Sequence, residues 1–170
     1  MINIELFKFF NSFAGVSSAG DKAIIFLASA LGLLLIILTI VFLFWHKEKK
    51  IKARELALVF VVSAAAWGLA TIFKNLIQHP RPDAILSDVY QLVVPDDPFS
   101  FPSGHATFFA ALATAIYFYH RRLGLYLGLG ALLIGLARVA AGLHFPADVL
   151  TGWGLGILVA GTVAYFRKKV

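Results

Sequence analysis

The 170-residue chain places three fixed cations in short polar stretches that contain few acidic residues. Lys74 and Arg81 lie in "KNLIQHPRP", and Arg138 lies in "ARVAAGLHFPADV". Three cations with few local counter-charges indicate a polyanionic ligand. Phosphate is the obvious one, because Arg offers its oxygens a bidentate fork and Lys offers a point charge.

The stretch "FPSGHATFF" supplies backbone donors and an acid–base group. Ser103 and Gly104 stand where a helix is expected to begin, and the free N–H groups at a helix N-terminus bind anions with the help of the helix dipole. Gly104 lets a phosphate approach the backbone closely, and His105 in the first turn is expected within reach of a bound phosphate ester. Taken alone, this stretch is more often a helix start capped by a serine, here Ser103.

A second histidine is followed at helical spacing by a carboxylate. Pro146 suits the first position of a helix, so Asp148 falls in the first turn, four residues after His144. This spacing lets the carboxylate fix the tautomer and orientation of the His144 ring. His79, beside Arg81, has no clear role in such chemistry and is expected to be structural.

Composition identifies the kind of molecule that must position these residues. Hydrophobic residues make up 60% of the chain and charged residues only 14%, and the mean hydropathy is +0.85. A soluble domain of this length is less apolar and carries more charge, so we expect a single-domain integral membrane protein. The chain has no cysteine, which excludes disulfides.

The uncharged runs predict an all-α polytopic bundle in which residues 1–170 form one domain. Five membrane spans are expected, at about 23–45, 56–73, 103–119, 123–138 and 147–166. Residues 1–22 predict an amphipathic helix lying in the membrane interface. Its apolar face consists of Ile2, Leu6, Phe9, Phe10 and Phe13, and its polar face of Glu5, Lys8, Asn11 and Ser12. An ordinary packed helix of the bundle is equally compatible with this pattern, whereas a cleavable signal peptide is not favoured.

The positive charge predicts the orientation in the membrane. Ten of the 15 basic residues fall on one side, namely Lys47, Lys49, Lys50, Lys52, Arg54, Arg121, Arg122, Arg167, Lys168 and Lys169. That side should be cytoplasmic, so the net charge of +6 reflects topology and not nucleic-acid binding. The polar motifs then meet at the outer face of the membrane.

Pairs of glycines suggest how the last two spans pack. Gly124 and Gly128, and Gly152 and Gly156, form two small-xxx-small spacings that allow close helix approach. We interpret them as packing within one chain, with a monomer favoured over a dimer.

Together these motifs resemble the three-part signature of the type-2 phosphatidic acid phosphatase superfamily, which also includes vanadium haloperoxidases and bacterial undecaprenyl-diphosphatases. The matching residues are Lys74-x6-Arg81-Pro82, Pro102-Ser103-Gly104-His105 and Arg138-x5-His144-x3-Asp148. The family usually has Ser where this chain has Ala137. The resemblance also implies that the family's six-helix core is reduced here to five spans plus the amphipathic start.

The resemblance implies a mechanism as well. His144 attacks phosphorus to give a phosphohistidine, Asp148 orients it, and His105 protonates the leaving oxygen. Charge on the phosphoryl group is then stabilised by Lys74, Arg81, Arg138 and the Ser103–Gly104 amides. No cofactor or metal is implied, because the cations do the work that a metal would do.

The leading substrate is undecaprenyl diphosphate, cleaved to the monophosphate, since family members of this compact size often act on it. Phosphatidic acid, phosphatidylglycerol phosphate and a lipid A phosphate remain alternatives. Five spans argue against a soluble haloperoxidase. A phosphate or lipid transporter would use the same cations but has little need for His144 paired with Asp148. The loop Asp83–Phe101 is either a cover for the site or a simple connection.

Overall fold

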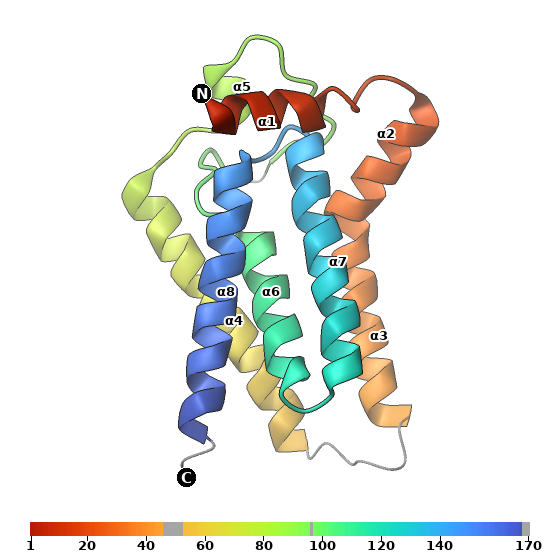
Figure 1. The fold of residues 1–170 in the computed structure, drawn as a ribbon, viewed down its shortest axis with the longest axis vertical. Helices are drawn as coiled ribbons and strands as arrows, with labels where there is room; N and C mark the ends of the chain where they lie inside the picture. Colours follow the sequence, from red (N-terminus) through yellow and green to blue (C-terminus); the bar gives the residue numbers. More distant parts are fainter. Residues whose placement is uncertain (46–52, 96, 168–170) are drawn as a thin grey trace.

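The computed structural model describes residues 1–45, 53–95 and 97–167, and in these ranges the chain is helical apart from its loops and one isolated antiparallel bridge between Pro80 and Phe99. In chain order the elements are α1 (Ile2–Asn11), α2 (Ser18–Ile25), the π-helical turn η1 (Phe26–Ala30), α3 (Leu31–Trp45), α4 (Ala53–Ile77), α5 (Pro82–Ile85), α6 (Gly104–Tyr117), α7 (Arg121–Ala140) and α8 (Pro146–Arg167). The long helices run side by side, and α1 lies across one end of the bundle (Figure 1). The all-α prediction is confirmed.

Four of the expected spans coincide with helices that are long and apolar enough to cross a membrane. Within the described residues these stretches are Ser18–Phe42, Leu56–Ile77, Arg121–Ala140 and Pro146–Arg167. The fifth expected span corresponds to α6, which has 14 residues and therefore reaches only about 21 Å, against a hydrocarbon core of about 30 Å. The predicted count of five spans is not confirmed.

The first membrane helix begins at Ser18 and not near residue 23 as the apolar run suggested. Ser17 caps α2 by accepting a hydrogen bond from the N–H of Gly20 at 3.1 Å. Helix α2 then continues through η1 into α3. The charged residues Asp21 and Lys22 end the uncharged run but do not end the helix, which is why the sequence placed the boundary too late.

Helix α6 lies at the centre of the bundle, between α4, α7 and α8 (Figure 1). Its small side chains are almost all buried, and Leu112 and Ile116 are fully enclosed. Two glycines of α8, Gly152 and Gly156, lie directly against the α6 backbone. Gly124 of α7 lies against Tyr117 at the far end of α6, so three of the four predicted glycines make packing contacts within this chain.

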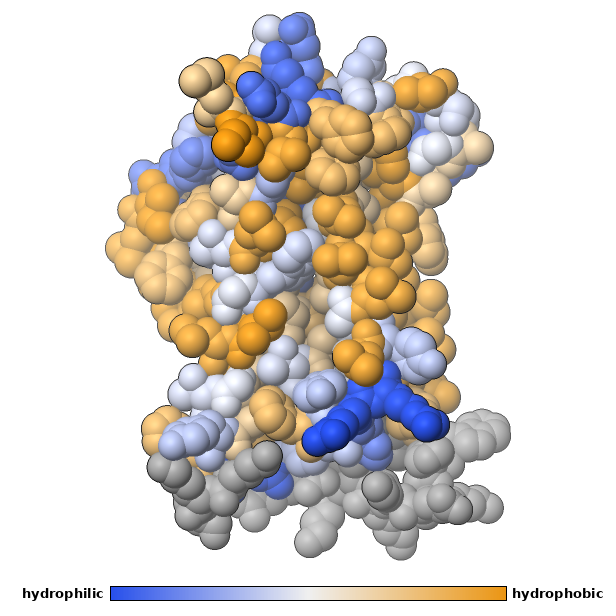
Figure 2. Space-filling model, viewed as in Figure 1, coloured by the Kyte–Doolittle hydropathy of each residue, from blue (hydrophilic) through white to orange (hydrophobic). Residues whose placement is uncertain are grey.

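The outer surface of the bundle matches a lipid environment. Hydrophobic residues make up much of the middle of the visible face, with near-neutral residues among them, and the most hydrophilic residues lie toward its two ends (Figure 2). The exposed apolar side chains include Leu33, Val61, Leu125 and Leu158. The protein is therefore a multi-pass membrane protein. Of the basic residues expected in the cytoplasm, 47, 49, 50, 52, 168 and 169 lie outside the described residues.

Helix α1 leaves most of its predicted apolar face exposed, including Phe9 and Phe13, but it buries one residue of its predicted polar face. Phe7 is completely buried against Phe145 with ring centroids 5.3 Å apart, and Asn11 is only 3% exposed. The Asn11 amide donates to the carbonyls of Tyr90 (2.8 Å) and Ala140 (2.9 Å) and accepts from the N–H of Tyr90 (3.0 Å). Asn11 was expected on the polar outer face. It is buried because it satisfies backbone groups that cannot reach water.

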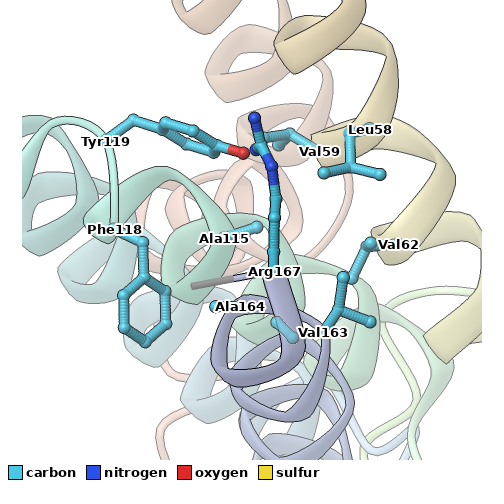
Figure 3. Close-up of a pocket in the computed structure, with 10 residues that line it drawn as sticks. Leu58, Val59, Val62, Ala115, Phe118, Tyr119, Val163, Ala164 and Arg167 are labelled. Carbon is cyan, nitrogen blue, oxygen red and sulfur yellow. The ribbon is translucent and has the colours of Figure 1, made fainter. Parts of the chain in front are cut away.

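At the opposite end of the bundle from α1, a cavity of about 190 Å³ opens between α4, α6 and α8. Apolar side chains such as Leu58, Val62 and Val163 line it, and the Arg167 guanidinium lies 5.1 Å from the centre of the Tyr119 ring (Figure 3). None of the residues in the predicted phosphate motifs lines this cavity, so we do not assign it to the chemistry described next.

Candidate active site

The first motif leaves the membrane at the end of α4. Lys74 occupies the last turn of α4, and Gln78 adopts a left-handed conformation (φ 51°) just beyond it. The chain then turns back over the bundle, and Pro82 begins α5 immediately after Arg81. Arg81 is 3% exposed, and its Nη1 donates to the carbonyl of Leu143 at 2.7 Å. Arg81 is thereby fixed next to the second histidine of the motifs.

Asp97, which the sequence did not single out, joins the two cations of this motif. Its Oδ2 lies 3.0 Å from Lys74 Nζ, and its Oδ1 accepts from Arg81 Nη2 at 3.0 Å. The Asp97 carbonyl also accepts from Arg81 Nε at 2.8 Å. Although burial raises the pKa of the Asp97 carboxyl, the hydrogen bond and charge of Lys74, with those of Arg81, hold it below its ordinary value of 3.8. Asp97 is therefore anionic at neutral pH.

The second motif begins α6, as the sequence predicted. Ser103 is the N-cap residue, but its side chain makes no capping bond. Its backbone N–H donates to the carbonyl of Asp148 at 3.0 Å. The Ser103 hydroxyl is completely buried, and no hydrogen-bond partner reaches it from the described parts of the chain. A buried hydroxyl without a hydrogen bond lowers the free energy of unfolding, unless a ligand forms a hydrogen bond with it.

His105 is the exposed histidine of the pair. It lies on the side of α6 that faces α3 and α4, where it lines a cavity of about 290 Å³ together with Trp67, Phe108 and Ile36. Burial lowers the pKa of the His105 ring, and the positive charges of Arg138, Lys74 and Arg81 lower it further. His105 therefore lies within electrostatic reach of the cation cluster while its own side chain borders an apolar hollow.

His144 is buried, with 1% of its surface exposed. Its Nδ1 lies 2.8 Å from the carbonyl oxygen of Ser100. Because a carbonyl can only accept, Nδ1 carries the proton and the lone pair resides on Nε2. Burial is the main reason that the pKa of His144 lies well below 6.5, and three positive charges lower it further: Arg138, Arg81 and Lys74. At neutral pH the ring is neutral.

Asp148 is placed less directly on His144 than its spacing suggested. Its Oδ2 lies 3.7 Å from His144 Nδ1, which exceeds hydrogen-bond length. The same oxygen accepts from the N–H of Phe145 at 2.8 Å in the turn that begins α8. The hydrogen bond that sets the ring's tautomer is thus made by Ser100, and Asp148 secures the turn that carries His144.

Arg138 is the motif residue that α7 contributes to the site. It lies in the last turn of that helix, is 8% exposed, and donates through Nη1 to the carbonyl of Ala28 at 3.2 Å. Ala137, where the family usually has Ser, is buried in an apolar cluster with Ala28, Ala141 and Leu143. The methyl group of Ala137 therefore packs among apolar side chains.

Two further residues support the site. Ser100 was not identified from the sequence, and His79 was expected to be only structural. Ser100 Oγ donates to the carbonyl of Pro80 at 2.9 Å, its N–H donates to the carbonyl of His79 at 2.8 Å, and its hydroxyl lies 3.1 Å from His79 Nδ1. These contacts tie the loop before α6 to the end of α4, and so hold the carbonyl that binds His144. No spacing in the sequence signals this role.

The structure therefore brings the three motifs to one end of the bundle. Lys74 and Arg81 share Asp97, Arg81 reaches the residue before His144, and the backbone of Asp148 binds that of Ser103. The arrangement combines buried cations, helix N-terminal amides and a neutral imidazole, which are the groups needed to bind a phosphate and attack it.

Comparison with known proteins identifies a family and several relatives. Residues 54–170 match the PAP2 superfamily. The chain is 28% identical over 170 residues to the bacitracin transport permease protein BcrC of Bacillus licheniformis, covering 99% of this chain and 82% of the relative. It is 27% identical to the undecaprenyl-diphosphatase BcrC of Bacillus subtilis, covering 93% and 80%. The crystal structure of Aquifex aeolicus LpxE superposes with a TM-score of 0.70 at 30% identity, covering 97% of this chain and 95% of that one.

Proposed function

The chain belongs to the PAP2 superfamily, and its relatives include proteins named as lipid phosphatases. We propose that it hydrolyses undecaprenyl diphosphate to undecaprenyl phosphate through a phosphohistidine intermediate. That the protein is a membrane lipid phosphatase follows from the family, as the motifs predicted. The substrate, the covalent step and the residues that carry it are the proposal.

The proposed nucleophile is Nε2 of His144. The observation that carries this assignment is the buried, neutral ring whose Nδ1–H donates to the Ser100 carbonyl, and whose pKa is lowered by burial and by the charges of three cations. A neutral imidazole has a lone pair available for attack on phosphorus, and the attack places positive charge on the ring. The nearby Asp148 carboxylate, 3.7 Å away, would then become a favourable partner.

The remaining motif residues have complementary roles. His105 protonates the oxygen of the leaving group and then activates water for hydrolysis of the phosphohistidine. The Ser103 hydroxyl and the first amides of α6 bind phosphoryl oxygens, and Gly104 allows their close approach. Lys74, Arg81 and Arg138 stabilise the charge that develops in the transition state, so no metal or other cofactor is required.

The substrate assignment draws on the relative named undecaprenyl-diphosphatase BcrC, which aligns over most of its own length. Another Bacillus subtilis relative carries the name phosphatidylglycerophosphatase B, which keeps phosphatidylglycerol phosphate as an alternative. Phosphatidic acid and a lipid A phosphate remain further alternatives. An amphiphile suits a site whose exposed histidine borders an apolar hollow between α3, α4 and α6.

We place the site at the outer face of a bacterial inner membrane, in a domain of residues 1–170 that acts as a monomer. Supporting this orientation, Arg121 and Arg122 are exposed at the bundle end opposite α1 and the motifs. The lipid phosphate would then be cleaved at headgroup level from the outer leaflet.

The decisive experiment measures orthophosphate release by purified protein from a panel of lipid phosphates and diphosphates, in excess EDTA. We expect undecaprenyl diphosphate to be the best substrate. His144→Ala should abolish release and acid-labile phosphate on the protein, whereas His120→Ala, at the other end of the bundle, serves as the matched control. If a monoester lipid is hydrolysed faster, that lipid replaces undecaprenyl diphosphate as the proposed substrate. Binding without release by the wild-type protein would favour a transporter, and loss of activity on chelation would refute the metal-free mechanism.

A further inference from the structure

The Asp97 carboxylate binds two of the three cations that the proposed mechanism assigns to phosphate. It accepts from Lys74 Nζ at 3.0 Å and from Arg81 Nη2 at 3.0 Å. These donors are buried, with side-chain exposures of 11% for Lys74 and 4% for Arg81, whereas Asp97 itself is 42% exposed. Carboxylate and phosphate oxygens use the same donors. A phosphate can therefore engage these cations fully only if the carboxylate gives way.

We propose that Asp97 is a specificity-determining residue, which occupies Lys74 and Arg81 in the empty site and yields them only to a terminal, doubly charged phosphate group. This inference rests on the proposed function, because it assigns the cations to substrate phosphate. It adds a way for the enzyme to reject the singly charged phosphodiester headgroups of ordinary anionic membrane lipids.

The charges explain the selection. Lys74, Arg81 and Arg138 carry three positive charges, and Asp97 removes one of them. A phosphate monoester, or the terminal phosphate of a diphosphate, has a charge of about −1.5 to −2 at pH 7, whereas a phosphodiester has only one negative charge. A single charge gains little by replacing the carboxylate, because it exchanges one anion for another. A double charge gains a net interaction.

The geometry allows the carboxylate to move without dismantling the site. Arg81 keeps two backbone partners that do not involve the Asp97 side chain, the carbonyls of Leu143 at 2.7 Å and of Asp97 at 2.8 Å. Asp97 lies in a segment without regular secondary structure, and its side chain is more exposed than that of either cation. Its departure leaves Arg81 aligned and Lys74 available to the incoming phosphate.

The test compares wild type with Asp97→Asn, which removes the charge but keeps an oxygen for the Phe99 N–H that Oδ1 accepts at 3.0 Å. Binding of orthophosphate and vanadate is measured by calorimetry, independently of turnover. Inhibition of lipid phosphate hydrolysis is measured in micelles containing phosphatidylglycerol or phosphatidylcholine. We expect Asp97→Asn to bind orthophosphate about tenfold more tightly, as expected when a competing charge-assisted hydrogen bond is lost, and to become inhibited by phosphatidylglycerol. Asp97→Glu should restore rejection of phosphatidylglycerol.

Weaker orthophosphate binding by Asp97→Asn than by the wild type would overturn the inference. If Asp97 merely holds Lys74 and Arg81 in place, Asp97→Asn will bind orthophosphate more weakly and phosphatidylglycerol will inhibit neither protein. Asp97→Ser provides a second neutral variant should Asn disturb folding, and Asp88→Asn, an exposed change in the same loop, is the matched control. If the wild type binds orthophosphate but hydrolyses no lipid phosphate, the proposed function fails. The change in orthophosphate affinity caused by Asp97→Asn still tests the inference in that case.

Discussion

Gly152 connects helix packing to the proposed chemistry. A Cβ built at this position of α8 would lie 2.7 Å from the carbonyl oxygen of Ser103, 3.0 Å from Cβ of Ala106 and 3.1 Å from Oγ1 of Thr107. Carbon–oxygen contacts of this kind normally measure about 3.3–3.6 Å. In Gly152→Ala the start of α6 must therefore retreat from α8 by roughly 0.6–0.9 Å, the difference between those contacts and the available space.

The expected result is a loss of activity that exceeds the loss of stability. Overpacking costs about 1–3 kcal/mol, but replacing Gly by Ala inside a helix returns about 0.8–1.0 kcal/mol, so the net destabilisation should be between roughly 0 and 2 kcal/mol. A displacement near 1 Å can lower the rate of reaction about 100-fold. The shift strains the hydrogen bond between the Ser103 N–H and Asp148, and it moves the proposed phosphate-binding turn away from His144.

Gly154 offers the matched control, because it is exposed on the same helix and no atom lies within 4 Å of an added Cβ. Gly154→Ala should keep full activity and gain up to about 1 kcal/mol. Phosphate release and thermal unfolding in detergent are measured on both variants. Wild-type kcat in Gly152→Ala, with a stability gain like that of Gly154→Ala, would refute the proposed coupling between this helix contact and the site.

Three further predictions concern other parts of the molecule. His105→Ala should spare diphosphate hydrolysis more than monoester hydrolysis, because a phosphate leaves with less protonation than an alkoxide; general acid catalysis is worth about 10²–10⁴ in rate, and equal losses on both substrates would contradict this role. The acidic limb of the pH–rate profile that reports His144 should lie below 6.5, since its lowered pKa keeps the ring neutral until the pH falls well under that value; a limb above 6.5 would argue against His144 as the neutral nucleophile. An impermeant thiol reagent should label Ser87→Cys but not Lys50→Cys in intact cells, and the reverse pattern would place the site in the cytoplasm.

The sequence predicted the parts of the fold and site that depend on local pattern. Uncharged runs identify membrane helices because the bilayer demands them, and Pro146 and Gly104 mark helix starts because their backbone preferences are local. The three motifs converge in the structure, although their roles in catalysis stay predictions.

Residues that act through tertiary contacts were not predictable in the same way. Asp97 has the same side chain as Asp83 and Asp88 in the same loop, and only the folded position beside Lys74 and Arg81 distinguishes it. Ser100 contributes a backbone carbonyl to His144, which any residue type carries. Periodicity placed Asn11 on the polar face, yet its long-range backbone partners bury it.

The attachment of α1 has a consequence for the order of events during biosynthesis. The Asn11 side chain binds the carbonyl of Ala140, 129 residues later, and Asn3 binds the N–H of Ala147, 144 residues later. At a synthesis rate of about 5–20 residues per second, roughly 6 to 26 s separate the emergence of Asn11 from that of Ala140. During that interval we expect the apolar side chains that α1 leaves exposed, among them Phe9 and Phe13, to hold the nascent helix at the lipid surface. The contact between Asn3 and Ala147, which follows His144, can form only after the start of α8 has been synthesised. An unfinished chain therefore cannot form the complete site.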